Sequence, residues 1–484
     1  MKENCSKEQK QARRMEWLFL LGVFLFFFLW SCTQRFNFSA DESMRYQVVQ
    51  YIYEHGTLPR GDEPSIRNED WGISYAFNPI IAYMGSAVLM KLVSIFTTDE
   101  WILLIAARFM NVLLGTLMVW VVRKASRLLF SEKYAWMFTC LVAFLPSNVI
   151  LYSYVNCDAL AMCSSAVIFY AWILAAKEGW SWKNCTVLAV GMGFCLLSYY
   201  NAYGYVLVSF FYFVAMILLR EQKKNRWKEL FGKGAWITVI VCVIALWWFI
   251  RNGILYDGDI FARQASHTCA ELYARDRYKP SNVVTFQEDG QSMLSMIFYR
   301  PIFLEHDWLT TVLFSFVGAF GYNKIYLSKW IIIPYLLFLL TALVLMVVYR
   351  KSDFYLKKEE IRRREPLGKE KALIRVTARS KEWKVQGMLS WAFVIAMIIP
   401  NFLNAYYSYS SDFQAQGRYS MPMLFPLMYF VTRGCERFFE EHEKLSKLEK
   451  YFCILVSVMA VVLAVFTWAR LIYPLYLQNY YGLR

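Results

Sequence analysis

The sequence predicts an all-α polytopic membrane protein, a bundle of about eleven transmembrane helices. Apolar runs recur from one end of the 484-residue chain to the other, and 58% of its residues are hydrophobic. Only 18% are charged, against about 25% in a soluble domain. The net charge of +15 falls in the loops between apolar runs, as the positive-inside rule predicts. That placement argues against nucleic-acid binding and against a soluble domain with one anchor.

The first apolar run, Trp17 to Cys32, follows four cationic residues, Lys7, Lys10, Arg13 and Arg14. A cleaved signal peptide ends in small residues, whereas this run ends in "FLWSC". We therefore expect a retained first transmembrane helix with its N-terminus in the cytoplasm. The eleven cysteines show no disulfide-like or zinc-like spacing, and most lie inside apolar runs, where they act as small hydrophobes.

Charge placement predicts which apolar runs cross. The eleven expected crossings begin near residues 17, 101, 134, 158, 185, 204, 235, 330, 385, 420 and 451. Two further runs, 77–96 and 308–320, are ambiguous. If neither crosses, most of the 52 lysines and arginines fall in cytoplasmic loops, which obeys the charge bias better. The two runs are then juxtamembrane or re-entrant helices on the outer side.

This topology divides the single domain, residues 1–484, into a bundle and three notable loops. The first outer loop covers 33–100, the second large outer loop 253–329, and a basic cytoplasmic loop 350–384. Topogenic charge touching anionic lipid explains the basic loop, with a regulatory partner as the alternative. Four polar clusters then share the outer face: Asp41-Glu42, Asn156-Cys157-Asp158, the loop from Arg251 to Asp307, and Gln416-Gly417-Arg418.

The stretch "SADE" resembles a capping box, with Ser39 at the N-cap and Glu42 three residues later. The helix is expected to end near Glu54 or His55, with Gly56 as its C-terminal cap. Its apolar stripe predicts an amphipathic helix at the membrane interface; the stripe is Met44, Val48, Tyr51, Ile52 and His55.

Asp41 and Glu42 form the candidate catalytic pair. Capping accounts for Glu42 but gives Asp41 only a favourable first-turn charge. An acid held at a membrane interface beside apolar walls suits a general base. Asp41 is therefore the residue that we expect to act as the base.

Two further clusters offer groups for a substrate. Asp158, which follows Asn156 in "SYVNCDALAMC", begins a helix that returns into the membrane. It serves as the cap of that helix, binds a metal or orients a substrate hydroxyl. Arg418, in "DFQAQGRYSMP", offers a planar fork that suits a phosphate, although snorkelling to headgroups explains it equally well. Gly417 permits close backbone approach.

The stretch "RNGILYDGDIF" supplies Arg251 as a second candidate for phosphate. Its Asp257-Gly258-Asp259 matches a DxD pattern only weakly, and a tight turn is the simpler interpretation. Three histidines, His55, His267 and His306, fit no known ligand spacing. No metal ligand is assigned, and a divalent metal ion stays open as a cofactor.

Read in order, several motifs resemble the GT-C superfamily of membrane glycosyltransferases, protein mannosyltransferases and aminoarabinose transferases among them. They are "ADESMRYQVVQYIYEHGTLP", "SYVNCDALAM", "RNGILYDGD", "LFSFVGAFGYNKIYLSKW" and "QGRYSMPMLFPL", and they cover about residues 16 to 430. The family often has a Pro-Pro-Leu-Tyr-Tyr stretch late in the first loop. Here that place reads "FNPIIAYMG", with one proline, Pro79.

The resemblance implies transfer of a hexosyl or pentosyl group from a polyprenyl-phosphate carrier to a glycan, lipid or protein acceptor. Transfer would occur on the outer face of the cell membrane, with inversion at the anomeric carbon. Asp41 would be the base and Glu42 its catalytic neighbour. The substrate and its phosphate would meet Arg418, Arg251, Asn252, Asp158, Asn156, Gln416 and Tyr419.

Two other classes of function remain. A lipid or sugar transporter, or flippase, of the cell envelope would favour charges in mid-membrane and broken helices in matching halves. The crossing segments here are nearly free of charge, which favours the enzyme. A structural or assembly protein would not need an acidic pair and arginines that converge on one face.

Overall fold

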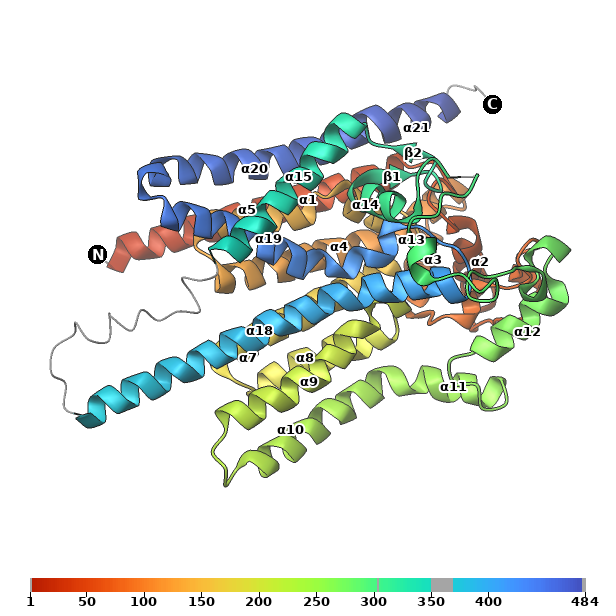
Figure 1. Cartoon of the computed structure of the whole chain (residues 1–484). Coiled ribbons are helices and arrows are strands. Elements are labelled where there is room, and N and C mark those ends of the chain that lie inside the picture. Colours follow the sequence, from red (N-terminus) through yellow and green to blue (C-terminus); the bar gives the residue numbers. More distant parts are fainter. Residues whose placement is uncertain (1, 303, 350–368, 481–484) are drawn as a thin grey trace.

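Long apolar helices run side by side in the computed structural model, which describes residues 2–302, 304–349 and 369–480 (Figure 1). The long helices are α1 (Lys2–Thr33), α4 (Glu100–Leu129), α5 (Glu132–Ala143), α7 (Asp158–Glu178), α8 (Trp182–Leu196), α9 (Tyr203–Arg220), α10 (Arg226–Val241), α11 (Trp247–Leu255), α15 (Lys329–Val348), α18 (Lys369–Ser410), α19 (Leu424–Glu441), α20 (Ser446–Thr467) and α21 (Tyr473–Tyr480). α10 continues into α11 through a π-helical turn, Cys242–Leu246, and α20 into α21 through another, Trp468–Ile472.

Within the described residues, eight helical segments are long and apolar enough to cross a membrane, or nine if the bent pair α5 and α6 (Pro146–Val149) counts as one span. The expected count of eleven is therefore not confirmed. The segments expected near residues 185 and 420 form α8 and α19. α8 has only 15 residues, and the second half of α19 carries Arg433, Glu436 and Arg437. Both still lie along the bundle, α8 against α7 and α19 against α15 (Figure 1).

The two ambiguous apolar runs form short helices, α3 (Ile81–Val93) and α14 (Trp308–Gly318). Their 13 and 11 residues span about 20 Å and 17 Å at 1.5 Å per residue. A hydrocarbon core is about 30 Å thick, so neither helix crosses it alone. Both are therefore suited to the juxtamembrane or re-entrant placement that charge predicts.

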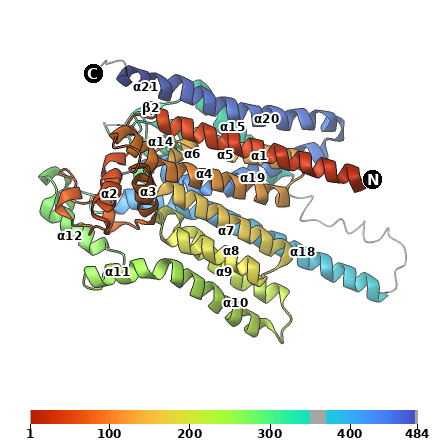
Figure 2. The same ribbon diagram turned by 180° about the vertical axis from the view of Figure 1, so that it is seen from behind.

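One end of the bundle gathers the short elements (Figures 1 and 2). α2 (Glu42–His55), α3, α12 (Arg263–Tyr273) and α13 (Met293–Ile297) lie there, away from the N-terminus. So does a two-stranded antiparallel hairpin, β1 (Ala319–Phe320) and β2 (Ile325–Tyr326), in which Ala319 pairs with Tyr326. The 3-10 helices are Pro64–Ile66, Tyr75–Phe77, Ile150–Tyr152, Tyr200–Ala202, Asp276–Tyr278, Pro280–Asn282, Gly417–Met423 (η8) and Glu443–Leu445.

α7 forms the centre of the bundle, and 83% of its apolar span is buried inside the protein. A helix that is apolar on every side suits such a position. Its aromatic side chains join neighbouring helices: Trp172 stacks on Tyr205 of α9, and Phe169 stacks on Phe393 of α18. The Trp172 indole N–H donates to Ser209 Oγ, so this buried polar atom is satisfied.

The capping box predicted for α2 is wrong. The helix begins at Glu42, and Asp41 occupies the N-cap with φ 64° and no side-chain cap. Ser39 instead accepts a hydrogen bond from Gln34. The other end agrees with the prediction, because α2 ends at His55 and Gly56 caps it with φ 67°.

The apolar stripe predicted along α2 is only partly buried. Met44 and Val48 are buried, whereas His55 is exposed. Arg45 and Val49 are buried instead. α2 packs against α3 and against the 3-10 helices Pro64–Ile66 and Tyr75–Phe77, so more of its surface is buried than in a helix that lies on a membrane surface.

Most of the predicted basic loop, residues 350–368, lies outside the described residues. From Lys369 the chain is helical and belongs to α18.

Candidate active site

Asp41 lies between α1 and α2 in a left-handed backbone conformation, with φ 64°. Its N–H donates to the Tyr322 hydroxyl at 3.2 Å, and that hydroxyl donates to Asn37. Tyr322 belongs to the turn of the β1–β2 hairpin, so the hairpin supports the strained segment. A non-glycine residue held in such a conformation costs about 1–3 kcal/mol and is typical of functional sites.

The two oxygens of the Asp41 carboxylate have different surroundings. Oδ2 accepts a hydrogen bond from the Tyr75 hydroxyl at 2.8 Å and one from Arg418 Nη2 at 3.4 Å. Within the described residues, no hydrogen bond reaches Oδ1. The side chain is 28% exposed, so a small polar group can approach Oδ1.

Arg418 enters the site from the 3-10 helix η8. Its Nη2 donates to Asp41 and, at 2.9 Å, to the Tyr419 hydroxyl. Nε and Nη1 are buried and make no hydrogen bond with a described residue, although the Tyr154 hydroxyl lies nearby. Nη2 is thus held in place, while the edge formed by Nε and Nη1 can donate hydrogen bonds to a ligand.

Gly417 explains how Arg418 reaches this position. Its N–H donates to Ser315 Oγ of α14 at 2.7 Å. A Cβ at this glycine would lie 2.2 Å from the backbone nitrogen of Phe316. Only glycine lets η8 approach α14 so closely, as the sequence predicts.

The pKa of Asp41 lies below its ordinary value. Burial raises this pKa, but the positive charges of Arg418 and Arg45 and the hydrogen bond from Tyr75 lower it further than burial raises it. Asp41 is therefore a carboxylate at neutral pH, the form that accepts a proton.

A second ion pair adjoins the first. Arg45 Nη1 donates to Asp158 Oδ2 at 3.2 Å, and both side chains are buried. Arg45 Nη2 lies 3.5 Å from the Tyr75 hydroxyl, and its guanidinium lies over the Tyr75 ring at 4.7 Å. Tyr75 thus connects the Arg45–Asp158 pair to Asp41. Asp158 Oδ1 is buried without a hydrogen-bond partner among the described residues.

Glu42 makes contacts of a different kind. Its carboxylate forms a bidentate pair with Arg108 of α4 at 2.7 and 2.8 Å, and neither side chain is exposed. It also accepts from the backbone N–H groups of Asn37 and Val155. Arg108 Nη1 donates to the carbonyls of Ser31 and Gln34 at the end of α1. With every Glu42 oxygen occupied, this geometry suits a positioning role better than proton transfer.

Of the other predicted residues, Tyr419, Gln416 and Asn156 lie near the Asp41–Arg418 contacts. Tyr419 lies beside Arg418 and stacks on Tyr199. The Gln416 carbonyl accepts from Asn404, which fixes the start of η8. Cys157, not Asp158, is the N-cap of α7, and it makes no side-chain cap. Asn156, one residue before it, accepts from the Ala159 N–H through Oδ1.

Arg251 and Asn252 are not part of the Asp41–Arg418 contacts. Arg251 donates to the carbonyls of Leu58 and Pro59, and Asn252 donates to the carbonyl of Ile260. Both therefore join α11 to neighbouring loops, and the tight turn predicted after them is present, with φ 50° at Asp257 and 94° at Gly258.

No group of three or more His, Cys, Asp or Glu side chains that could hold a metal ion occurs in the described part of the chain. The His55 ring stacks on Tyr51, and His306 lies against Phe314, so the histidines do not converge. The two acids nearest the site, Asp41 and Asp158, are each already paired with an arginine.

Sequence reasoning missed four residues of this region: Arg45, Tyr75, Arg108 and Tyr322. Arg108 carried a usable signal, because an arginine within the apolar run "WILLIAARFMNVLL" is expensive in a membrane unless it is paired. The tyrosines carried none, since Tyr is enriched at every membrane interface.

No model of a known protein family and no curated protein matches the sequence. Solved structures do match. An oligosaccharyltransferase from Archaeoglobus fulgidus, tethered with an acceptor peptide containing the NVT sequon via a disulfide bond, matches with a TM-score of 0.50 and 12% identity; the match covers 95% of this chain and 55% of that one. The chain therefore has the fold of this oligosaccharyltransferase.

Other GT-C structures match along most of the chain. ArnT from Cupriavidus metallidurans in the apo state gives a TM-score of 0.48 at 14% identity, and the match covers 88% of this chain and 60% of that one. ArnT bound to undecaprenyl phosphate gives 0.47 at 14% identity, with 96% and 74% covered. The chain thus spans 60% of the apo ArnT chain and 55% of the oligosaccharyltransferase chain, and the likeness concerns the fold.

Proposed function

We propose that this chain is a membrane glycosyltransferase that moves a sugar from a polyprenyl-phosphate donor to an acceptor, with inversion. One observation supports this most directly. A carboxylate with one free oxygen lies 3.4 Å from a guanidinium whose Nε and Nη1 make no hydrogen bond with a described residue, on a GT-C fold. These are the two groups that the reaction needs, side by side.

Asp41 is the proposed base. An acceptor hydroxyl is a poor nucleophile at neutral pH, so it needs a carboxylate to take its proton as the new bond forms. The free Oδ1 accepts that proton while Tyr75 and Arg418 hold Oδ2. The acceptor oxygen then attacks the anomeric carbon from the side opposite the phosphate, which inverts that carbon.

Arg418 is the proposed phosphate ligand. As the bond between the anomeric carbon and the phosphate oxygen breaks, its electron pair stays on the phosphate. A phosphate leaving group needs a cation more than a proton. Nε and Nη1 of Arg418 form a fork that fits two phosphate oxygens while Nη2 stays on Asp41.

The partners follow from this chemistry. The polyprenyl tail would lie against the lipid-facing helices, and the acceptor would be a glycan, a lipid or a protein. Whether the transferred group is a hexosyl or a pentosyl is left to the assay. We place the site on the outer face of the cell membrane, with the N-terminus in the cytoplasm, because described basic residues such as Arg127, Lys228 and Arg437 lie at the opposite ends of their helices.

The test is transfer by the full chain reconstituted in liposomes with labelled polyprenyl-phosphate sugars and candidate acceptors. Wild type is compared with Asp41→Asn, and with Asp62→Asn as a matched change at an exposed acid of the same outer loop. We expect transfer by wild type and Asp62→Asn, and loss with Asp41→Asn. Equal transfer by all three would refute the assignment of the base. Movement of the labelled lipid across the bilayer without consumption of the donor would support a transporter or flippase instead.

A further inference from the structure

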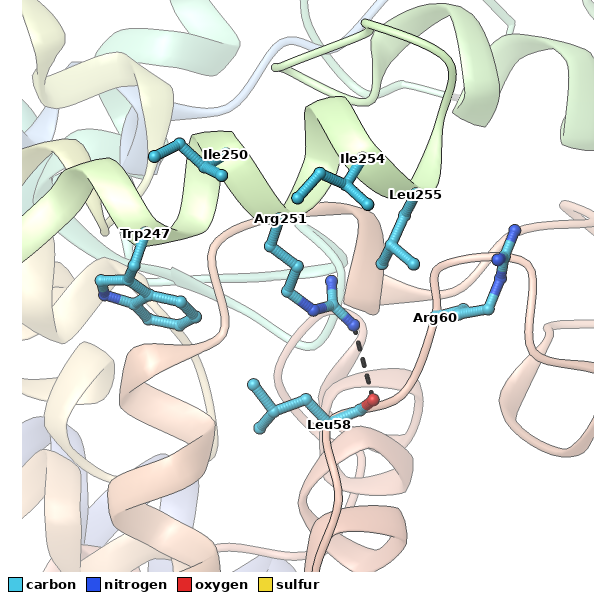
Figure 3. Close-up of a pocket in the computed structure, with 7 residues that line it drawn as sticks. All are labelled: Leu58, Arg60, Trp247, Ile250, Arg251, Ile254 and Leu255. Atoms are coloured by element: carbon cyan, nitrogen blue, oxygen red, sulfur yellow. Dashed lines mark hydrogen bonds between the residues drawn. The ribbon is translucent and has the colours of Figure 1, made fainter.

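A pocket of about 620 Å³ lies between α11 and the segment that follows α2 (Figure 3). None of its residues belongs to the Asp41–Arg418 contacts. Its lining runs along α11 from Trp247 to Leu255, directly after a π-helical stretch, and such stretches are frequent at functional sites. The lining residues are Leu58, Arg60, Trp247, Ile250, Arg251, Ile254 and Leu255.

Arg251 supplies the polar wall of this pocket. Its Nη2 donates to the Leu58 carbonyl at 3.4 Å (Figure 3). It also donates to the Pro59 carbonyl at 2.7 Å, and the two contacts fix the guanidinium. Its Nη1 is buried and makes no hydrogen bond with a described residue, although the Tyr256 hydroxyl lies nearby. A buried donor of a charged group is destabilising when it is left unpaired, so a ligand oxygen there is favoured.

The charges around the pocket favour a ligand with one negative charge. Arg60, the other cation, is held bidentately by Asp62 at 2.9 and 3.1 Å, and Asp257 lies near it as well. Within the described residues, no acidic side chain forms an ion pair with Arg251. One uncompensated positive charge on Arg251 therefore remains.

The rest of the pocket is apolar and faces outward. Ile250 is 51% exposed and Ile254 is 76% exposed, and Trp247 completes the wall (Figure 3). These side chains continue an exposed apolar ridge that runs back along the same span through Val243 and Leu246. An alkyl chain lying along the span would cover this ridge.

We infer that this pocket binds an anionic phospholipid of the bilayer. The phosphodiester, with its single negative charge, accepts from Arg251 Nη1, and an acyl chain packs on Ile250 and Ile254. The bound lipid would tie α11 to the loop that leaves α2, the helix beginning beside Asp41. This site is additional to the proposed glycosyl-transfer site and shares no residue with it.

The test measures lipid binding to the purified full chain by native mass spectrometry in detergent. The probes are phosphatidylglycerol, zwitterionic phosphatidylcholine, undecaprenyl phosphate and inorganic phosphate. Arg251→Gln removes the charge. Ile254→Glu leaves the Pro59 contact intact and repels an anion, and Ile254→Gln is its neutral control. Lys228→Gln removes a charge at the opposite end of the same span, and Arg418→Gln disables the proposed active site.

We expect phosphatidylglycerol to bind wild type about fivefold more tightly than Arg251→Gln, the effect of roughly 1 kcal/mol per basic residue near a membrane surface. Ile254→Glu should lower the affinity for phosphatidylglycerol by the same factor. Ile254→Gln, Lys228→Gln and Arg418→Gln should bind it like wild type. Unchanged binding by Arg251→Gln and Ile254→Glu would overturn the inference. Displacement of the lipid by inorganic phosphate, or a stronger dependence on Arg251 for undecaprenyl phosphate than for phosphatidylglycerol, would overturn the choice of ligand. Arg418→Gln tests the donor site separately, so the two proposals can fail independently.

Discussion

The two carboxylate oxygens of Asp41 differ in their hydrogen bonds. Tyr75 and Arg418 hold Oδ2, while Oδ1 accepts no hydrogen bond from a described residue. Asp and Asn tolerate the left-handed backbone better than most residues, so Asp41→Asn keeps the backbone conformation while it removes the base. We expect this variant to lower kcat about 10²–10⁴-fold with little change in donor affinity. A rise in KM without a fall in kcat would contradict the role.

The pH dependence of stability tests the surroundings of Asp41. Because the folded pKa lies below the ordinary value of about 3.9, ionisation of Asp41 stabilises the fold above that value. This stabilisation is lost as pH falls through the folded pKa. The difference in Tm between wild type and Asp41→Asn should therefore stay constant from pH 7 to about 5 and shrink below about 4. A difference that changes between pH 6 and 8 would mean that another group titrates.

Replacement of Arg418 by lysine should weaken binding of the donor. A lysine keeps the charge but has no planar fork, so it cannot hold Asp41 and two phosphate oxygens together. We expect Arg418→Lys to raise KM for the donor about tenfold, the effect of one charge-assisted hydrogen bond, and Arg418→Gln to raise it further. Steady-state kinetics at varied donor concentration measure this. Equal KM values for lysine and arginine would show that only the charge matters.

Among the elements, α1, α2 and α4 meet at the Glu42–Arg108 pair. Arg108 binds carbonyl groups at the end of α1, and Glu42 begins α2 directly after Asp41. Removing one partner of a buried pair costs about 3–5 kcal/mol, so Glu42→Gln and Arg108→Gln should each lower the free energy of unfolding by that order.

Denaturant titration in detergent measures this, with the exposed pair as the control: Arg60→Gln should cost less than about 1 kcal/mol. Glu42→Asp, which keeps the charge, should recover part of the activity if Glu42 positions Asp41. A stable but inactive Glu42→Gln would instead support Glu42 as a catalytic group.

The contact between η8 and α14 depends on Gly417. A Cβ there meets the Phe316 backbone at 2.2 Å, so Gly417→Ala must push η8 away and move Arg418. We expect a loss of about 1–3 kcal/mol in stability together with weaker donor binding. Gly387→Ala in α18 is the matched control, because its Cβ would meet nothing within 4 Å and alanine favours a helix.

At the scale of the whole molecule, the orientation in the membrane is a prediction. Single cysteines that replace His267 in α12 and Lys228 in α10, both exposed, should react with a membrane-impermeant maleimide from opposite sides. We expect residue 267 to react in intact cells and residue 228 only after permeabilisation. The reverse pattern would place the Asp41 site on the cytoplasmic face.

Hydropathy and charge predicted the helical bundle and the meeting of polar clusters at one end, because both depend on local composition. The pairings within the site were less predictable. The sequence favours Asp41 as the base because the predicted Ser39–Glu42 capping box leaves it without a role. That capping box is wrong, so this part of the reasoning does not hold. Arg108 meets Glu42 across 66 residues, and Arg45 meets Asp158 across 113. Such pairs depend on how helices pack, which no local pattern encodes.

The separation of 377 residues between Asp41 and Arg418 also bears on when activity can begin. At about 5–20 residues per second, a ribosome adds Arg418 roughly 20–75 seconds after it has added Asp41. Throughout that interval the inserted helices hold the proposed base without its cationic partner. Under the proposed function, a nascent chain therefore cannot consume a donor lipid during insertion, and activity would begin only once η8 has packed against α14.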